Sequence, residues 1–206
     1  MPTAPLPGGR QADEGVDRRV PIDRSPGETA AAGGRTVVVK LLLLADTHIP
    51  KRAKDLPSVV WDEVDRADVV IHAGDWVDLA SFEALERRAK RLIACWGNND
   101  GPDLRSRMPE RADVTLSGLR FTVTHETGAS VGRDKRMSIA YPDTDVLVFG
   151  HSHIPWDTTT GTGLRLLNPG SPTDRRRQPY CTYMTACVAD GDLGDVVLHR
   201  IEKVNR

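Results

Sequence analysis

The sequence predicts an α/β (α+β) domain that combines parallel and antiparallel strands. In the first half of the chain, short apolar runs alternate with segments of helical periodicity, a pattern typical of parallel strands joined by helices. In the second half, apolar runs are separated by short glycine-containing turns, a pattern typical of hairpins. We therefore expect a mostly parallel half joined to an antiparallel half.

The first half contains alternating strands and helices. An apolar strand is expected at residues 37–45 and a helix at residues 58–67, where Val60, Trp61 and Val64 share one side. The next elements are a strand at residues 68–73, a helix at residues 79–91 and a strand at residues 91–96. This alternation implies a parallel sheet with right-handed crossovers.

The second half begins with a hairpin. Strands at residues 114–116 and 119–125 flank Ser117 and Gly118, which suit a tight turn. The following elements are a short helix at residues 134–141, an apolar strand at residues 145–150, and two hairpins that turn near residues 161–163 and 190–194.

Length and composition limit the classes of function. The chain has 206 residues and a net charge of −1, so it lacks the basic excess that indicates a nucleic-acid partner. Its three cysteines are dispersed, which predicts no disulfide framework and suits a reducing compartment. No apolar run is long enough to span a membrane, and we see no secretory signal. We expect a cytoplasmic protein that acts on a small molecule; a homo-oligomer is compatible with the sequence.

The N-terminal segment differs from the rest of the chain. Residues 1–35 are rich in Pro, Gly, Ala, Arg and Asp and contain almost no large apolar side chains. Such a segment buries too little surface to offset the entropy lost on ordering. We expect residues 1–35 to be a disordered or loosely attached extension and residues 36–206 to form a single domain.

Each of five apolar strands ends in polar residues that can bind metal. In chain order these groups are Asp46-Thr47-His48, His72-Ala73-Gly74-Asp75, Gly97-Asn98-Asn99-Asp100, His125 alone, and Gly150-His151-Ser152-His153. One such group by itself is more often turn chemistry than a metal site. Because ligands collect at the carboxyl ends of strands in open α/β sheets, the five together can converge on one site.

The residue types in these groups favour divalent transition metals. Carboxylate oxygen, amide oxygen and imidazole nitrogen suit such ions, whereas an all-oxygen set would favour Mg²⁺ or Ca²⁺. The candidate ligands are Asp46, His48, Asp75, Asn98, His125, His151 and His153. One tetrahedral ion needs fewer ligands, and this set suffices for two ions if one carboxylate bridges them. We expect manganese, with iron, cobalt, nickel or zinc as alternatives.

The ordered series D-x-H, G-D, G-N-x-D, a lone His and G-H-x-H resembles the calcineurin-like metallophosphoesterase superfamily. The resemblance covers about residues 38–171, and the order and rough separations of the motifs match. The small size and the segment Asn168-Pro169-Gly170-Ser171 resemble the single-domain bacterial and archaeal phosphodiesterase branch. The resemblance implies a four-layer αββα sandwich of two mixed β-sheets flanked by helices.

The resemblance also implies a role for each ligand. One ion would be held by Asp46, His48 and His153, and the other by Asn98, His125 and His151. Asp75 would bridge the two ions. A hydroxide formed between them would attack phosphorus in line, so the predicted function is a dinuclear phosphoesterase, first of all a phosphodiesterase. The predicted catalytic residues are Asp75, Asn98, Asn99, His125 and His151.

Asn99 departs from the family pattern. Many members have a His directly after the G-N pair, where it can protonate the leaving oxygen. A neutral amide has no proton that titrates near pH 7, so Asn99 can donate a hydrogen bond to the phosphoryl group but cannot be a general acid. We therefore expect a preference for esters with good leaving groups, such as aryl or nucleotide phosphodiesters.

Two alternative functions stay open. A retromer subunit that resembles this family serves mainly as an interaction scaffold with an eroded metal site, whereas every matching ligand position here holds a competent residue. Gly128-Ala129-Ser130-Val131-Gly132 matches the G-x-S-x-G pattern of serine hydrolases. However, three residues separate this pattern from the preceding strand, and no oxyanion segment of the HGGG type is present.

Several nearby residues have less specific interpretations. We expect His72 to pack or hydrogen bond behind the ligands rather than bind metal, and Asp100 to cap the following turn. Trp76 and Trp156 are candidates to line a substrate pocket. The basic run at residues 175–177 is more typical of a solvated loop than of a phosphate or nucleic-acid site.

Overall fold

The computed structural model describes residues 37–202, and the extension predicted at residues 1–35 lies outside that range. The strands are β1 (Val39–Leu44), β2 (Val69–Ala73), β3 (Leu92–Cys95), β4 (Arg111–Leu116), β5 (Leu119–Thr124), β6 (Val146–Val148), β7 (Trp156–Thr159), β8 (Arg165–Asn168), β9 (Cys181–Ala189) and β10 (Asp192–Ile201). The helices are α1 (Ser58–Arg66), α2 (Leu79–Arg88), α3 (Pro102–Arg107) and α4 (Arg133–Ala140). Within residues 37–202, no helix is long and apolar enough to cross a membrane.

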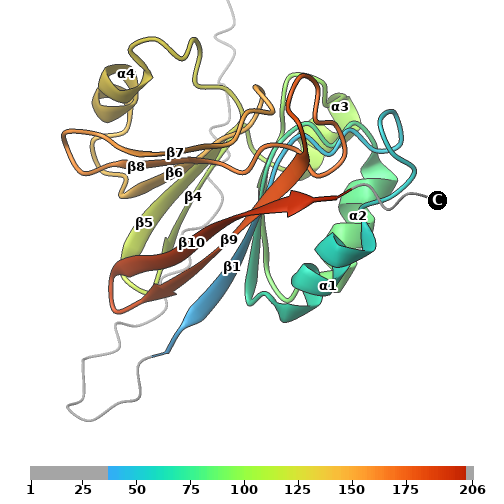
Figure 1. Cartoon of the computed structure of the whole chain (residues 1–206), viewed down its shortest axis with the longest axis horizontal. Helices are drawn as coiled ribbons and strands as arrows, with labels where there is room; N and C mark the ends of the chain where they lie inside the picture. The colour runs from blue at the N-terminus through green and yellow to red at the C-terminus, as the bar shows by residue number, and fades with distance from the viewer. Residues whose placement is uncertain (1–36, 203–206) are drawn as a thin grey trace, which may run out of the picture. The chain divides into compact units, whose positions relative to one another are not determined.

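The first sheet has the strand order β10-β9-β1-β2-β3. Strands β1, β2 and β3 are parallel, and β9 pairs antiparallel with β1. Helices α1 and α2 cover one face of this sheet (Figure 1). Val60 and Val64, one helical turn apart on α1, pack in one cluster with Leu42 and Leu44 of β1. The amphipathic stripe of α1 therefore anchors it to the sheet.

The second sheet has the strand order β4-β5-β6-β8-β7. Strands β5, β6 and β8 are parallel, and β4 and β7 pair antiparallel at the two edges. Helix α4 covers its outer face, where Met137 packs with Leu147, Phe149 and Leu166.

The two sheets enclose a shared apolar core. Leu41 and Leu43 of β1 face this core together with Phe121 and Val123 of β5, whereas the alternate residues of β1 face the helices. A strand buried on both faces explains the continuous apolar run in the sequence. The resulting order of layers is helix, sheet, sheet, helix, which confirms the predicted αββα sandwich of two mixed sheets.

The predicted division into a parallel half and an antiparallel half is wrong. The last hairpin, β9–β10, returns to the first sheet, and the second sheet contains three parallel strands. Turn signals mark which consecutive strands form a hairpin, but they do not show which sheet receives it.

Several element boundaries differ from the prediction, and one short helix was not predicted. Helix α2 ends at Arg88 rather than at residue 91, because Ala89 has an extended backbone with ψ at 138°. Strand β6 is limited to three residues. Helix α3 was not predicted, since six residues are too few to show periodicity; its signals are Gly101 at the N-cap, Pro102 in the first turn and one buried side chain, Leu104.

Candidate metal centre

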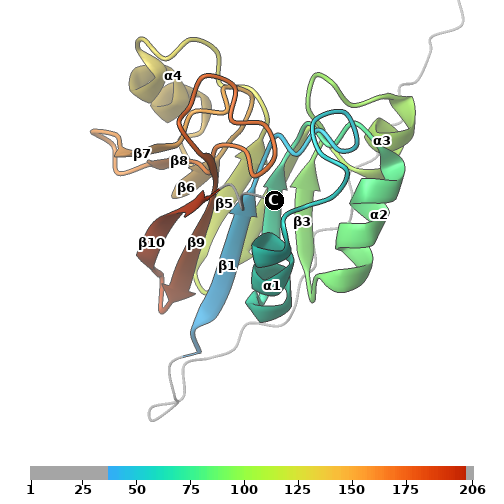
Figure 2. The same ribbon diagram turned by 45° about the vertical axis from the view of Figure 1, so that its right-hand side comes forward.

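Polar residues that follow five strands meet at one end of the two sheets. Figure 2 shows the loops after β1, β2 and β3 at the same end. Backbone hydrogen bonds join these loops, since the N–H of Asp46 donates to Gly74 at 2.9 Å and that of His48 donates to Asp75 at 3.0 Å. The second sheet is tied in by the N–H of Gly150, which donates to His125 at 3.1 Å. The sheet edges thus bring residues distant in sequence into one site.

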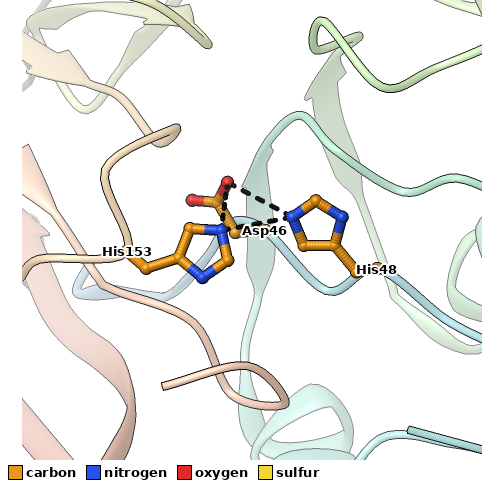
Figure 3. Close-up of side chains that lie close together, drawn as sticks. All are labelled: Asp46, His48 and His153. Carbon is orange, nitrogen blue, oxygen red and sulfur yellow. Dashed lines mark hydrogen bonds and ion pairs between the residues drawn. The ribbon is translucent and has the colours of Figure 1, made fainter. Parts of the chain in front are cut away.

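The first group consists of Asp46, His48 and His153, and all three side chains are buried. Figure 3 shows the carboxylate of Asp46 and the two imidazole rings pointing toward one another. The Nε2 atom of His153 lies 3.3 Å from Asp46 Oδ1 and 3.2 Å from His48 Nε2. Three potential ligand atoms therefore surround one small volume, close enough to share one cation.

The second group consists of Asn98, His125 and His151. The Oδ1 atom of Asn98 lies 3.1 Å from His125 Nε2 and 2.9 Å from His151 Nδ1. His125 is buried, whereas Asn98 and His151 are exposed. The second group is therefore the side of the centre that solvent and a substrate can reach.

Asp75 lies between the two groups. Its Oδ2 atom is 3.4 Å from His48 Nε2 of the first group and 3.3 Å from His125 Nε2 of the second. The predicted ligands are thus brought together in two groups with a carboxylate between them. Their assignment to two metal ions stays a prediction.

The donor atoms are suited to cations. Nδ1 of His153 lies 2.6 Å from the carbonyl oxygen of Asp174, which can only accept, so we assign the proton to Nδ1. With its proton on Nδ1, the ring of His153 presents its Nε2 lone pair to Asp46 Oδ1, a contact between two acceptors that a cation would stabilise. Among the residues that the structure describes, Asp46 Oδ2 is also buried without a hydrogen-bond partner. The residues present therefore fit a divalent ion with nitrogen and oxygen ligands.

Five of the predicted ligands have a left-handed backbone. These residues and their φ angles are Asp46 at 56°, His48 at 46°, Asp75 at 62°, His151 at 69° and His153 at 57°. L-residues other than Asn and Asp rarely adopt this region, which costs about 1–2 kcal/mol per residue. Backbone strain is therefore concentrated at this centre, where such strain commonly accompanies function.

Gly97 shows why one glycine is needed beside the ligands. A Cβ atom at this position would overlap Asp75 Oδ1, lie 2.5 Å from Asp75 N and lie 2.9 Å from His125 Cδ2. Gly97 therefore allows the backbone after β3 to pass close to Asp75.

Asp100 and Asn99 hold the carboxylate-bearing loop in place. The buried carboxylate of Asp100 accepts the backbone N–H groups of Asp75 at 3.0 Å, Gly97 at 2.7 Å and Val77 at 2.7 Å. Asp100 was predicted only to cap the following turn, but its carboxylate joins the loops after β2 and β3. Asn99 donates to Asp75 Oδ1 through its backbone N–H at 2.9 Å and to Oδ2 through its side chain at 2.7 Å.

The Asn-Pro-Gly-Ser segment supports the other side of the centre. Asn168 donates to the carbonyl of Gly150 at 2.9 Å, and Ser171 donates to the carbonyl of Asp46 at 2.7 Å. The carbonyl of Asp174 fixes the ring of His153. The sequence reasoning missed Asp174, since the contact uses its backbone and no residue type signals it.

The ionisation of the buried groups is coupled. Burial disfavours the charged form of Asp46, but the neighbouring imidazoles of His153 and His48 outweigh burial and lower its pKa. Burial also raises the pKa of Asp75, but the hydrogen bond and charge of His125 and the hydrogen bonds from Asn99 outweigh this effect and lower the pKa. Burial also opposes charge on His125, yet contact with Asp75 and the charge of Asp46 raise its pKa. Both carboxylates are thus ionised near neutral pH, as metal ligands must be.

His72 lies behind the ligands, as expected. Its ring stacks on Trp76 with ring centroids 3.5 Å apart, and its Nε2 lies 3.2 Å from Thr47 Oγ1. Burial lowers the pKa of His72 to about 3, so this ring is neutral. Trp76 itself is buried and donates to the carbonyl of Cys95 at 3.1 Å. Trp76 is mainly a core residue, although it borders a pocket beside Thr47 that faces α1 and α2.

The remaining candidates have different surroundings. Within residues 37–202, Ser130 Oγ forms no hydrogen bond with a His, so a nucleophile–base pair is not assembled there. In the basic run, Arg175 donates to the carbonyl of Gln178 at 2.8 Å and Arg176 to that of His151 at 3.1 Å. These two arginines therefore brace the loop around the centre.

Sequence comparison identifies the family. The family model described as the calcineurin-like phosphoesterase superfamily domain matches residues 39–191. A probable metallophosphoesterase of Methanocaldococcus jannaschii is 34% identical over 132 residues, which cover 64% of this chain and 67% of that protein. A probable metallophosphoesterase of Mycoplasma genitalium is 31% identical over 176 residues, which cover 79% of this chain and 95% of that protein.

Solved structures agree with this assignment. A Thermotoga maritima protein superposes with a TM-score of 0.63 at 29% identity and covers 79% of this chain and 99% of its own. Vps29 of Entamoeba histolytica, solved in complex with Zn²⁺, superposes with a TM-score of 0.64 at 22% identity and covers 79% of this chain and 98% of its own. The second likeness concerns the fold alone. With its fold, its ordered ligand groups and a family match over most of its length, the chain belongs to the calcineurin-like phosphoesterase superfamily.

Proposed function

We propose that this protein is a dinuclear metal-dependent phosphodiesterase that hydrolyses small-molecule phosphate esters. The observation that carries the proposal is the position of Asp75 between two groups of ligand atoms. A phosphodiesterase of Methanocaldococcus jannaschii is 29% identical over 128 residues, which cover 56% of this chain and 74% of that protein. Manganese is the first candidate metal, followed by iron, cobalt, nickel and zinc.

The chain's own residues would prepare the centre for phosphate chemistry. Two bound cations would lower the pKa of a water between them and neutralise charge that develops on the phosphoryl oxygens. Asp75 holds its place through Asn99 and Asp100, so little reorganisation is needed when a substrate binds. The exposed His151 and Asn98 lie where a phosphoryl group can approach, and a ring N–H of His151 can donate a hydrogen bond to it.

Asn99 fits a preference for good leaving groups. Its side chain donates to Asp75 and carries no titratable proton, so it cannot supply a proton to a departing alkoxide. Aryl phosphodiesters release a less basic phenolate oxygen and need no such proton, whereas a sugar alkoxide would have to take its proton from water. Aryl phosphodiesters are therefore the expected substrate class.

The test compares hydrolysis of an aryl phosphodiester and an aryl phosphomonoester by wild type, Asp75→Asn and Asp143→Asn. Asp143 is an exposed residue in a loop and serves as the matched control. We expect activity that disappears with chelator, returns with Mn²⁺, and falls at least about 100-fold in Asp75→Asn but not in Asp143→Asn. Activity that survives chelation would instead support Ser130, and Ser130→Ala would then abolish it. Metal binding without hydrolysis of either ester would favour the scaffold function.

A further inference from the structure

We infer that the substrate carries a second anionic group, a terminal phosphate or phosphonate, that binds Arg133 in a pocket beside the metal centre. The inference rests on the proposed function and defines its substrate more closely. The pocket has a volume of about 210 Å³, and its lining residues are Gly128, Ser130, Arg133, Ser152, Ile154 and Trp156. A drug-sized ligand needs a larger cavity, so this pocket suits one substituent rather than a whole substrate.

Arg133 is a buried cation without a matching anion. Only 5% of its surface is exposed, and among residues 37–202 no carboxylate forms an ion pair with it. Among the described residues, its Nε has no hydrogen-bond partner, and its single hydrogen bond is long, 3.4 Å from Nη2 to the carbonyl oxygen of Gly128. A guanidinium offers five N–H donors, so most of its capacity is unused. An unpaired buried charge is costly, and a bound oxyanion would remove that cost.

The surroundings hold the guanidinium in position without neutralising it. Its Cζ lies 4.8 Å from the ring centroid of Phe149 and 4.6 Å from that of Trp156. Aromatic faces stabilise a cation and limit its rotation, but they leave its N–H edge free for a planar bidentate contact. Burial lowers the pKa of Arg133, although the group stays charged in proteins.

Arg136, one turn along α4, shows what a structural arginine does in the same loop. Its guanidinium donates to three backbone carbonyls, those of Val131 at 2.7 Å, Thr127 at 3.2 Å and Ala129. Arg136 thereby builds the loop that carries Ser130. Arg133, in contrast, lines the pocket that this loop encloses.

The pocket is adjacent to the reacting centre through the chain. Ser152 stands between the predicted ligands His151 and His153, and Gly128 follows His125 by three residues. The hydroxyl groups of Ser130 and Ser152 can join Arg133 in binding phosphoryl oxygens. A diester whose scissile phosphate lies at the metals can thus place the end of one arm against Arg133.

The kinetic test uses three p-nitrophenyl phosphodiesters whose second arm is propyl, 2-carboxyethyl or 2-phosphonoethyl, with Mn²⁺ present. For wild type, we expect kcat/KM for the phosphonate arm to exceed that for the propyl arm about 10- to 100-fold. Arg133→Met should remove this advantage and leave the propyl substrate within about threefold of wild type. Lys135→Met, which removes an exposed charge from the same helix, should retain the advantage. A larger advantage for the carboxylate than for the phosphonate would overturn the assignment to phosphate.

Two further measurements separate the possible failures. Ser130 lies in an exposed loop, so Ser130→Ala is expected to fold even if Arg133→Met does not. This variant should reduce the ratio of kcat/KM for the phosphonate arm to that for the propyl arm about threefold. Binding of inorganic phosphate is measured by calorimetry with chelator, for wild type and Arg133→Lys. If phosphate binding weakens in Arg133→Lys but no diester is hydrolysed, the pocket binds phosphate and the proposed phosphodiesterase function is wrong. If hydrolysis depends on metal but its rate is equal for all three arms in every variant, the phosphodiesterase function is supported and the role of the pocket is wrong.

Discussion

The carboxylate of Asp100 accepts the backbone N–H of Asp75 at 3.0 Å and thereby fixes the residue that lies between the two ligand groups. The same carboxylate accepts the backbone N–H of Gly97 at 2.7 Å and that of Val77 at 2.7 Å. Asp100 therefore organises the loops after β2 and β3, although within residues 37–202 it forms no hydrogen bond with a ligand side chain. Such supporting contacts commonly control metal affinity.

Asp100→Asn should weaken both folding and metal binding. An amide has one acceptor oxygen, so its NH₂ group would face a backbone donor in a buried position. We expect the free energy of unfolding to fall by about 1–3 kcal/mol and the affinity for Mn²⁺ to fall about 10- to 100-fold. Denaturant unfolding with chelator and metal titration measure the two effects. Asp192→Asn, at an exposed position of β10, is the control, and equal behaviour of the two variants would contradict this role.

The left-handed backbone of His48 predicts an unusual ranking of two substitutions. With chelator present, His48→Gly should be more stable than His48→Ala by about 1 kcal/mol, because glycine adopts a φ of 46° without strain. At Glu86, within α2 and exposed, the glycine variant should instead be less stable than the alanine variant by about 0.5–1 kcal/mol. Thermal unfolding of the four variants measures both differences. The same ranking at both positions would show that His48 is not strained.

Two histidines predict a maximum in the stability of the metal-free protein near pH 6.5. The pKa of His72 is lowered from 6.5 to about 3, so its stabilising contribution is complete above pH 6.5 and is lost as the pH falls toward 3. The pKa of His125 is raised above 6.5, so its contribution is complete below pH 6.5 and is lost as the pH rises through the raised value. Thermal unfolding in chelator from pH 5 to about pH 9 measures both limbs.

The variants His72→Gln and His125→Gln show which histidine causes the loss of stability on each side of the pH maximum. His72→Gln should flatten the acidic limb, and His125→Gln should flatten the alkaline limb. Added Mn²⁺ should reverse the alkaline limb, because a metal replaces the proton on Nε2 of His125 and its binding strengthens as the pH rises. A profile that stays unchanged in His125→Gln would refute the coupling of His125 to Asp75.

Asn99→His should broaden the range of leaving groups. An imidazole at this exposed position can protonate a basic leaving oxygen near neutral pH. We expect kcat/KM for an alkyl phosphodiester, relative to an aryl phosphodiester, to rise about 10- to 100-fold. Asn99→Gln retains an amide and should leave this ratio unchanged. An equal change for both esters in Asn99→His would indicate an effect on metal binding rather than on proton transfer.

The layers were predicted from the resemblance to the family, whereas the residues themselves predicted the first strand and the polar groups that follow the strands. The residues of β1 form a continuous apolar run because they are buried on both faces, and ligands follow directly after strands. The return of β9 to β1 was not predictable, since pairing across 140 or so residues leaves no local signal. The contacts of Asp100, Asp174 and Arg133 were also missed, because their roles depend on three-dimensional neighbours and not on residue type.

The position of β1 between β2 and β9 has a consequence for biosynthesis. Residues 39–43 leave the ribosome well before their antiparallel partners, residues 184–188, have been made. Until then the nascent chain presents an open, apolar strand edge, the kind of surface that chaperones protect from aggregation. The ring of His153 is likewise fixed only when residue 174 has been added, so metal acquisition is expected only after that residue has left the ribosome.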